Sequence, residues 1–277
     1  MSASIQPPLV GAAMPSSVLE HHLDWLSDGG RDLEIQDFAS PDVLDSDDFT
    51  DHVKKIKTQL DGYTGRIGIH APFWNLTLAA YDQRVRVVVQ DRLNHALDAA
   101  AEIGATHMVI HSPLEFLGAP ASLTSPGVAS VTVFDVVRDT LEEIVKRTSE
   151  IGCTLVIENI YDTSPRLLTD LVASFDSDYV RQSLDTGHAY IMHHHRSAPP
   201  PDYYVNTAGE LLGHIHIQDT DGYSDRHWAI GEGHINFQSI FNEVAKLDTN
   251  PRLILELRDH SGIESSATYL ADLGLVT

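Results

Sequence analysis

Nine histidine and carboxylate side chains could bind metal ions, because imidazole nitrogens and carboxylate oxygens are common protein ligands of divalent ions. Most of them come at or just after the ends of short apolar runs, as in RIGIH, HMVIH, TLVIE, RQSLD, GHIH and LILE. One such residue alone would mean little. The same chemistry at successive run ends predicts a metal site assembled from distant parts of the chain, namely from His70, His111, Glu158, Asp185, His188, His216, Asp225, His227 and Glu256.

The apolar runs are expected to be β-strands, and stretches with apolar residues at helical spacing separate them. The expected strands are Leu9–Ala13, Leu33–Phe38, Ile67–His70, His107–His111, Thr154–Glu158, Val180–Asp185, His214–Ile217 and Leu253–Leu257. After a first helix that ends at Gly29 and Gly30, helices are expected near 48–60, 81–103, 130–151, 164–175, 237–247 and 263–273.

Repeats of strand and helix at roughly thirty-residue spacing predict an α/β fold, a single (β/α)8 TIM barrel over residues 1–277. In such a barrel the carboxyl ends of all strands meet at one mouth, which would bring the nine side chains together. An open, doubly wound sheet is the alternative. The sequence disfavours it because no glycine-rich nucleotide loop follows the first expected strand.

Composition limits the partners that the chain could have. Its formal net charge of −22 opposes nonspecific binding to DNA, RNA and anionic membranes, so no nucleic-acid or membrane partner is expected. Cys153 is the only cysteine, which excludes an internal disulfide and cysteine metal clusters. The start MSASIQPPLVG lacks a basic region followed by an apolar core, and no apolar run approaches membrane-spanning length. We therefore expect a cytoplasmic protein.

Glu158 and Glu256 each end a run that is otherwise apolar, where a buried carboxylate is costly unless it is paired or bound to metal. A salt bridge that caps the barrel is the alternative, which is disfavoured because Asn159 beside Glu158 is polar too and the chain is short of basic partners. The spacings Asp185-Thr-Gly-His188 and Asp225-Arg-His227 could each present two ligands together, the second pair if its backbone is extended. A helix cap or a turn would explain either pair in isolation.

Other histidines receive simpler interpretations. The run His193–His195 and the proline-rich segment Ala198–Asp202 are expected to form a solvated loop, part of a lid, after the sixth strand. His107 is expected to be a surface or packing residue. Of His214 and His216 on the seventh strand, one is expected to face away from the barrel interior.

The segments VIEN, SLDTGH, HIHIQD, DRHWAIGEG and LILEL resemble signatures of the xylose isomerase-like TIM barrels, which include sugar isomerases, sugar epimerases and the endonuclease IV group. The resemblance covers nearly the whole chain. The one-metal isomerases and epimerases imply a metal bound by Glu158, Asp185, His216 and Glu256. There the two glutamates would also be catalytic and move protons on and off the sugar carbon, and His188 and Arg226 would contact substrate oxygens.

The endonuclease IV group implies instead three zinc ions on all nine positions. The chain departs from that group elsewhere, because its opening VGAAMP lacks the glycine-rich, histidine-containing start and basic DNA-contacting loops are not apparent. One divalent ion with three carboxylates leaves a charge of about −1, which suits a neutral sugar and a carboxylate base. Three ions with four carboxylates leave about +2, which suits a phosphate.

The resemblance therefore implies a metal-dependent isomerase or epimerase that acts on a small sugar or sugar phosphate. The divalent cofactor would be Zn²⁺, Mn²⁺, Mg²⁺ or Co²⁺, with one to three ions per chain. A trinuclear zinc phosphoesterase that does not act on DNA is the alternative. Lyases, dehydratases and a noncatalytic metal-binding protein stay open on the same scaffold, as does assembly into a homo-oligomer.

Overall fold

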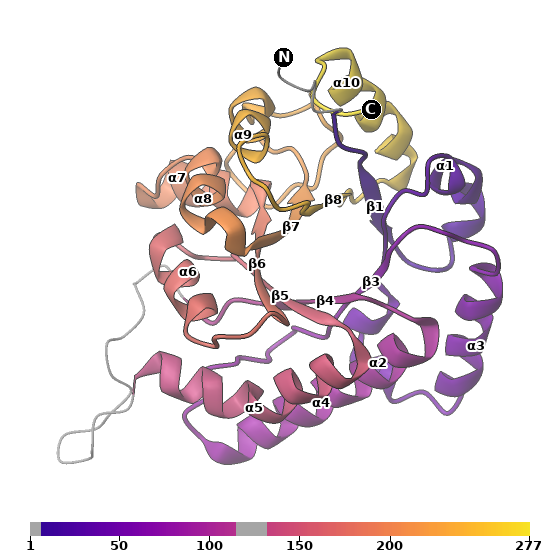
Figure 1. Ribbon diagram of the computed structural model, residues 1–277, viewed down its shortest axis with the longest axis vertical. Helices are drawn as coiled ribbons and strands as arrows, with labels where there is room; N and C mark the ends of the chain where they lie inside the picture. The colour runs from indigo at the N-terminus through magenta and orange to yellow at the C-terminus, as the bar shows by residue number, and fades with distance from the viewer. Residues whose placement is uncertain (1–6, 115–131) are drawn as a thin grey trace.

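A computed structural model describes residues 7–114 and 132–277, in which strands and helices alternate (Figure 1). The strands are β1 Gly11–Met14, β2 Leu33–Ile35, β3 Ile67–His70, β4 His107–His111, β5 Thr154–Glu158, β6 Val180–Asp185, β7 Leu212–Ile217 and β8 Arg252–Leu255. The helices are α1 Leu23–Ser27, α2 Pro41–Leu44, α3 Phe49–Gln59, α4 Gln83–Ile103, α5 Val133–Ile151, α6 Pro165–Ala173, α7 Thr186–Arg196, α8 Pro201–Ala208, α9 Phe237–Val244 and α10 Ile263–Asp272. The expected start of the α5 helix at residue 130 lies outside the described residues.

The strands pair in parallel and in chain order, and β1 pairs with β8 to close the barrel. In Figure 1 the helices form a ring around the strands. The predicted (β/α)8 barrel is confirmed, and the open sheet is excluded. Because the strands are parallel, all their carboxyl ends open at one mouth of the barrel.

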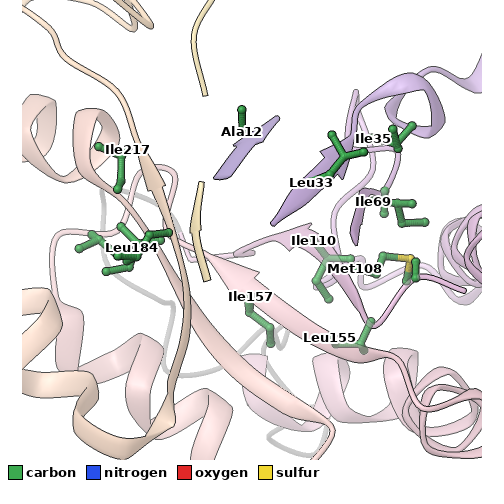
Figure 2. Packing of buried hydrophobic residues seen from close by; sticks show 14 of the residues in the cluster. Ala12, Leu33, Ile35, Ile69, Met108, Ile110, Leu155, Ile157, Leu184 and Ile217 are labelled. Atoms are coloured by element: carbon green, nitrogen blue, oxygen red, sulfur yellow. The ribbon is translucent and has the colours of Figure 1, made fainter. Parts of the chain in front are cut away.

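Apolar side chains on alternate strand positions form the core between the barrel and its helices (Figure 2). On β2, Leu33 and Ile35 belong to this core, and on β4 Met108 and Ile110 do so. Each fully buried side chain of this size contributes roughly 1.5–3 kcal/mol to folding. Successive strand residues point to opposite faces, so the residues between them are directed into the barrel. This alternation places Glu34 inside the barrel.

The long helices begin and end at residues that satisfy the free backbone groups of helix ends. The Asp82 side chain accepts the backbone N–H of Arg84 at the start of α4, and Gly104 ends that helix in the left-handed conformation at φ 73°. Thr132 and Asp135 form a reciprocal capping box at the start of α5. Within the described ranges, no helix is both long enough and apolar enough to cross a membrane.

The stretch between β6 and β7 was expected to be a loop, and this is wrong for its histidines. His193–His195 belong to the last turn of helix α7, where their side chains are exposed. The proline-rich segment is a loop only in part: Ala198–Pro200 connect α7 to α8, whereas Pro201 and Asp202 begin α8, because proline fits the first helical turn.

The expectation that either His214 or His216 faces away from the barrel interior is also wrong. Both side chains face the interior, because both reach the Glu34 carboxylate.

Candidate metal centre

A pocket of about 740 Å³ opens at the carboxyl ends of the strands. Its lining includes the side chains of His70, His111, Glu158, His188, Asp225, His227 and Glu256. Asp185 and His216, the remaining two predicted ligands, are fully buried. The ligand atoms fall into three groups, and within each group the atoms lie within 4.8 Å of one another. We call them the outer group (His70, His111, Glu158), the central group (Glu158, Asp185, His216, Glu256) and the loop group (His188, Asp225, His227).

The outer group combines the ends of β3, β4 and β5. Glu158 Oε2 lies 3.7 Å from His70 Nε2 and 4.0 Å from His111 Nε2. His70 donates its Nδ1–H to the Ala71 carbonyl at 2.8 Å, which leaves Nε2 as the nitrogen that faces the carboxylate. Phe73 stacks on His111 with ring centroids 4.1 Å apart and limits the movement of that imidazole.

The central group combines the ends of β5, β6, β7 and β8, and it shares Glu158 with the outer group. His216 Nδ1 lies 3.4 Å from Glu158 Oε2 and 3.4 Å from Glu256 Oε2. Asp185 also begins helix α7, because its Oδ1 accepts the backbone N–H of His188 at 2.6 Å. The same hydrogen bond that starts the helix therefore fixes where Asp185 sits in the group.

The loop group joins α7 to the segment after β7. Asp225 lies 3.5 Å from His188 Nε2 and 3.0 Å from His227 Nε2. As in His70, the other ring nitrogen donates a hydrogen bond to a main-chain carbonyl. His188 Nδ1 donates to Asn159 O at 3.1 Å, and His227 Nδ1 donates to Glu256 O at 3.0 Å. A hydrogen bond of this kind fixes the tautomer and the ring orientation of a metal-binding histidine.

The loop that carries Asp225 and His227 is held by the buried carboxylate of Asp219. This carboxylate accepts the backbone N–H groups of Gly231 and Gly233 at 2.9 Å each. A Cβ atom at position 233 would lie 2.3 Å from Asp219 Oδ1, so only glycine allows this close approach. His227 has a positive φ of 50°, a conformation that costs energy in a residue with a side chain and needs support from its surroundings.

Gln218 connects the central and loop groups. Its Nε2 donates to Asp225 at 3.0 Å and lies 3.3 Å from Asp185 Oδ1, while its Oε1 accepts the backbone N–H of His227 at 2.9 Å. On the other side of the mouth, Gln36 Nε2 donates to Glu256 Oε1 at 2.9 Å. Neither glutamine follows from the ligand spacing, although Gln218 comes directly after the expected strand that carries the predicted ligand His216.

The carboxylates and imidazoles of these groups shift one another's pKa. Burial would raise the pKa of Glu158, but the facing His216 and the contacts with His188 and His70 hold it well below its ordinary range. Burial raises the pKa of Asp185 to about 6 against the effect of His188, and the charge of Glu158 adds to the rise. Burial would lower the pKa of His227, yet the hydrogen bond to Asp225 and the charge of Glu256 raise it to about 9. Protons on imidazoles thus balance part of the carboxylate charge.

The Arg226 side chain does not line the main pocket, unlike those of its neighbours Asp225 and His227. Its guanidinium lies 2.9 Å from Asp221 Oδ2 and over the Trp228 ring, and it lines a separate hollow of about 470 Å³. Substrate contact by Arg226 therefore stays a prediction, and so does substrate contact by His188, which lines the main pocket.

The fold and these residues can be compared with known proteins. A family model described as xylose isomerase-like TIM barrel matches residues 29–275. An uncharacterized protein of Methanocaldococcus jannaschii, MJ1311, is 28% identical over 71% of this chain, and the match spans 66% of that relative, just under two thirds of its length. Fructoselysine 3-epimerase of Escherichia coli O157:H7 is 23% identical over 69% of this chain and 68% of its own.

Solved structures give the same picture. The TTHB071 protein from Thermus thermophilus, soaked with ZnCl2, superposes with a TM-score of 0.72 at 27% identity and covers 95% of this chain and 97% of its own. A D-tagatose 3-epimerase-like protein superposes with a TM-score of 0.70 at 25% identity and covers 88% of this chain and 89% of its own.

Proposed function

This chain belongs to the xylose isomerase-like TIM barrel family, and we propose that it is a metal-dependent enzyme that isomerises or epimerises a small sugar or sugar phosphate. The observation that carries the proposal is the pair of glutamates at the ends of β5 and β8. Glu158 and Glu256 both line the pocket, and both lie 3.4 Å from the same His216 nitrogen. The epimerases among the similar proteins support the sugar substrate.

The donor set of the central group fits a divalent cation. Glu158 Oε2 and His216 Nδ1 are buried and 3.4 Å apart, yet within the described residues neither atom makes a hydrogen bond. Such unpartnered polar atoms are costly unless something else satisfies them. Three carboxylates and one imidazole are an oxygen-rich set that suits Mn²⁺, Mg²⁺ or Co²⁺. When bound, the ion would polarise a substrate carbonyl oxygen.

The two glutamates would carry the proton transfers. One glutamate, as the carboxylate, removes the proton from the carbon next to the substrate carbonyl, and the other, as the carboxylic acid, delivers its proton to the opposite face, which inverts that carbon. Glu256 is oriented for this by the Gln36 hydrogen bond, and Glu158 by its imidazole neighbours. His188 lines the same pocket and would donate to a substrate hydroxyl.

Aromatic side chains on one wall of the pocket also suit a sugar. Phe73 and Trp74 both line it, and 69% of Trp74 is exposed. Apolar and aromatic walls with a few converging polar groups are typical of pockets that orient small molecules. The volume of about 740 Å³ lies in the usual range for such sites.

Phosphoester hydrolysis by three ions is the second candidate, and one observation favours it. All nine predicted ligands fall into complete groups, whereas the isomerase reaction requires only the central group. Three divalent ions with four carboxylates would leave a charge of about +2, which attracts a phosphate and activates water. The 27% identical protein soaked with ZnCl2 makes zinc the first ion to test.

Metal content and isotope exchange together distinguish the two reactions. We would count ions per chain after purification without added metal and incubate the protein with ketoses and sugar phosphates in deuterated water. The proposal predicts that the unaltered protein incorporates a deuterium atom at the inverted carbon. Neither Glu158→Gln nor Glu256→Gln should incorporate it. His70→Ala and His111→Ala, which alter only the outer group, should cost far less activity.

A different result would overturn the isomerase proposal. Three ions per chain, release of phosphate without sugar inversion, and equal loss of activity in His70→Ala, Asp225→Asn and His227→Ala would establish the hydrolase. In that case each variant should also bind fewer ions than the unaltered protein, because each removes a ligand from the outer or the loop group.

A further inference from the structure

A second polar cluster lies inside the barrel, on the closed side of the central group. Its centre is Glu34, the middle residue of β2, whose side chain is fully buried. Glu34 Oε1 lies 3.0 Å from His216 Nε2, and Glu34 Oε2 lies 3.1 Å from His107 Nε2 and 3.2 Å from His214 Nε2. All three imidazoles are themselves fully buried.

The contact with His216 differs from those of the other oriented ligand histidines. The Nδ1 atoms of His70, His188 and His227 each hydrogen-bond a main-chain carbonyl. His188 Nδ1 also lies 3.3 Å from Glu158 Oε1, and His227 Nδ1 lies 3.5 Å from Glu256 Oε2, whereas His70 faces the outer group through Nε2. His216 is reversed: its Nε2 faces the Glu34 carboxylate, and its Nδ1 faces Glu158 and Glu256. A carboxylate oxygen can only accept here, so the Nε2 atom carries a hydrogen, and with an ion in the central group Nδ1 would present its lone pair to that ion.

We propose that Glu34 is a positioning residue that holds His216 as a ligand of the central group. The inference deepens the proposed function and rests on the metal centre proposed there. A carboxylate on the far nitrogen fixes the ring orientation and makes the imidazole a stronger electron-pair donor to a metal ion than a carbonyl partner would. His216 would therefore be a more basic ligand than His70, whose far nitrogen bonds the neutral Ala71 carbonyl.

The surrounding residues hold Glu34 in this position. Ser183 Oγ lies 2.8 Å from His214 Nδ1, so the hydroxyl can donate to that nitrogen while His214 Nε2 faces Glu34. His107 approaches from β4 over Gly68. A Cβ atom at position 68 would lie 1.8 Å from the His107 ring, so the absence of a side chain on β3 makes room for the imidazole. In the described residues, the hydrogen bonds and ion pairs of Glu34 are all with histidines.

The test compares Glu34→Gln with Asp162→Asn. Both replace a buried carboxylate by an amide of the same shape, but Asp162 is hydrogen-bonded to Ser112 and lies outside the three groups. We would measure Zn²⁺ affinity and ions per chain by competition with a chelator, and the protonated nitrogen of His216 from two-bond ¹H–¹⁵N spectra of the Zn²⁺-loaded protein.

Glu34→Gln should lower the affinity of the central group for its ion by about 10–100-fold and change the nitrogen shifts of His216. The reason is that an amide can also donate to Nε2, which favours the tautomer with its hydrogen on Nδ1. Asp162→Asn should change neither. If Glu34→Gln does not fold, Ser183→Ala provides the second variant, with a smaller loss of affinity and the same direction of change in the spectra.

The outcomes separate this inference from the function on which it rests. If the unaltered protein binds no ion in the central group, the proposed metal centre fails. If it does bind one, and Glu34→Gln keeps both its affinity and its His216 spectrum, the positioning role is wrong. An additional ion that disappears in Glu34→Gln would also overturn it, because Glu34 would then be a ligand.

Discussion

The two ends of the barrel neutralise their carboxylates in different ways. At the amino-terminal end, Asp32 accepts from Arg66 Nε at 2.8 Å and from Arg66 Nη2 at 2.5 Å, and Arg252 lies 4.0 Å away. At the carboxyl end, the ion pairs of Glu158 and Asp225 are with histidines. The first end uses guanidinium groups, which keep their charge at every physiological pH.

The two kinds of ion pair respond differently to the loss of a proton. A guanidinium–carboxylate pair cannot lose its proton, so its charge balance is permanent. An imidazole balances a carboxylate only while it is protonated, and as a neutral ring it is a metal ligand. If the mouth of the barrel binds metal ions as proposed, these ions would replace imidazole protons without any change in the carboxylates.

The largest effect that we predict follows the loss of Glu158. Glu158→Gln removes the carboxylate shared by the outer and central groups, so any ion bound by either group should be lost, and turnover of the active substrate should fall by about 10²–10⁴-fold or more. Elemental analysis and steady-state kinetics would measure this. Full ion content in Glu158→Gln would show that the shared carboxylate is no ligand.

Next in size is the effect of pH on metal binding. His227 has a pKa raised to about 9, so at pH 7 the metal-free loop group holds a proton that an incoming ion must displace. Affinity should therefore rise with pH, about tenfold per unit for each displaced proton, and level off above about pH 9. Calorimetry in buffers of different ionisation enthalpy measures the released protons. An affinity that does not change between pH 6 and 8 would contradict the prediction.

A smaller effect is expected at the opposite end of the barrel. Asp32→Asn breaks the pair with Arg66, whose side chain is 41% exposed, so the free energy of unfolding should fall by no more than about 1 kcal/mol. Urea unfolding would measure it. Ion content should stay at the level of the unaltered protein, and a loss of ions would show that the two ends are not independent.

For duplex DNA we expect no measurable effect. With a net charge of −22, the chain should show no submicromolar affinity for a duplex with an abasic site at physiological salt. Fluorescence anisotropy with a labelled duplex would test this. Tight binding would instead favour a repair reaction at the three ligand groups.

The sequence predicted the barrel and the convergence of the nine side chains because both depend on strand ends. Where an apolar run stops at a histidine or a carboxylate, as TLVIE does before Asn159, the polar residue marks the end of the strand in the sequence. Helix α7 was missed because a run of histidines followed by prolines has weak helix propensity. The helix begins at the Asp185 side chain, which accepts the backbone N–H of His188. Because Asp185 also ends a strand, the sequence indicated a metal ligand there and not the start of a helix.

Glu34 was missed for a different reason. It lies in the middle of a strand of three residues, and the sequence LEI does not show whether the glutamate faces solvent or the barrel axis. Only the closed barrel fixes that direction. The error over His214 and His216 was avoidable, because residues two apart on a strand point to the same face.

Glu158 also has a thermodynamic consequence, because it belongs to two ligand groups at once. Any ion in the outer group changes the charge and the freedom of the carboxylate that the central group needs, so the two occupancies cannot be independent. Reciprocity then requires that each ion alter the affinity of the other by the same factor. Binding at the two sites would be cooperative if the first ion helps the second by ordering Glu158. It would be anticooperative if repulsion between the two ions is the larger effect.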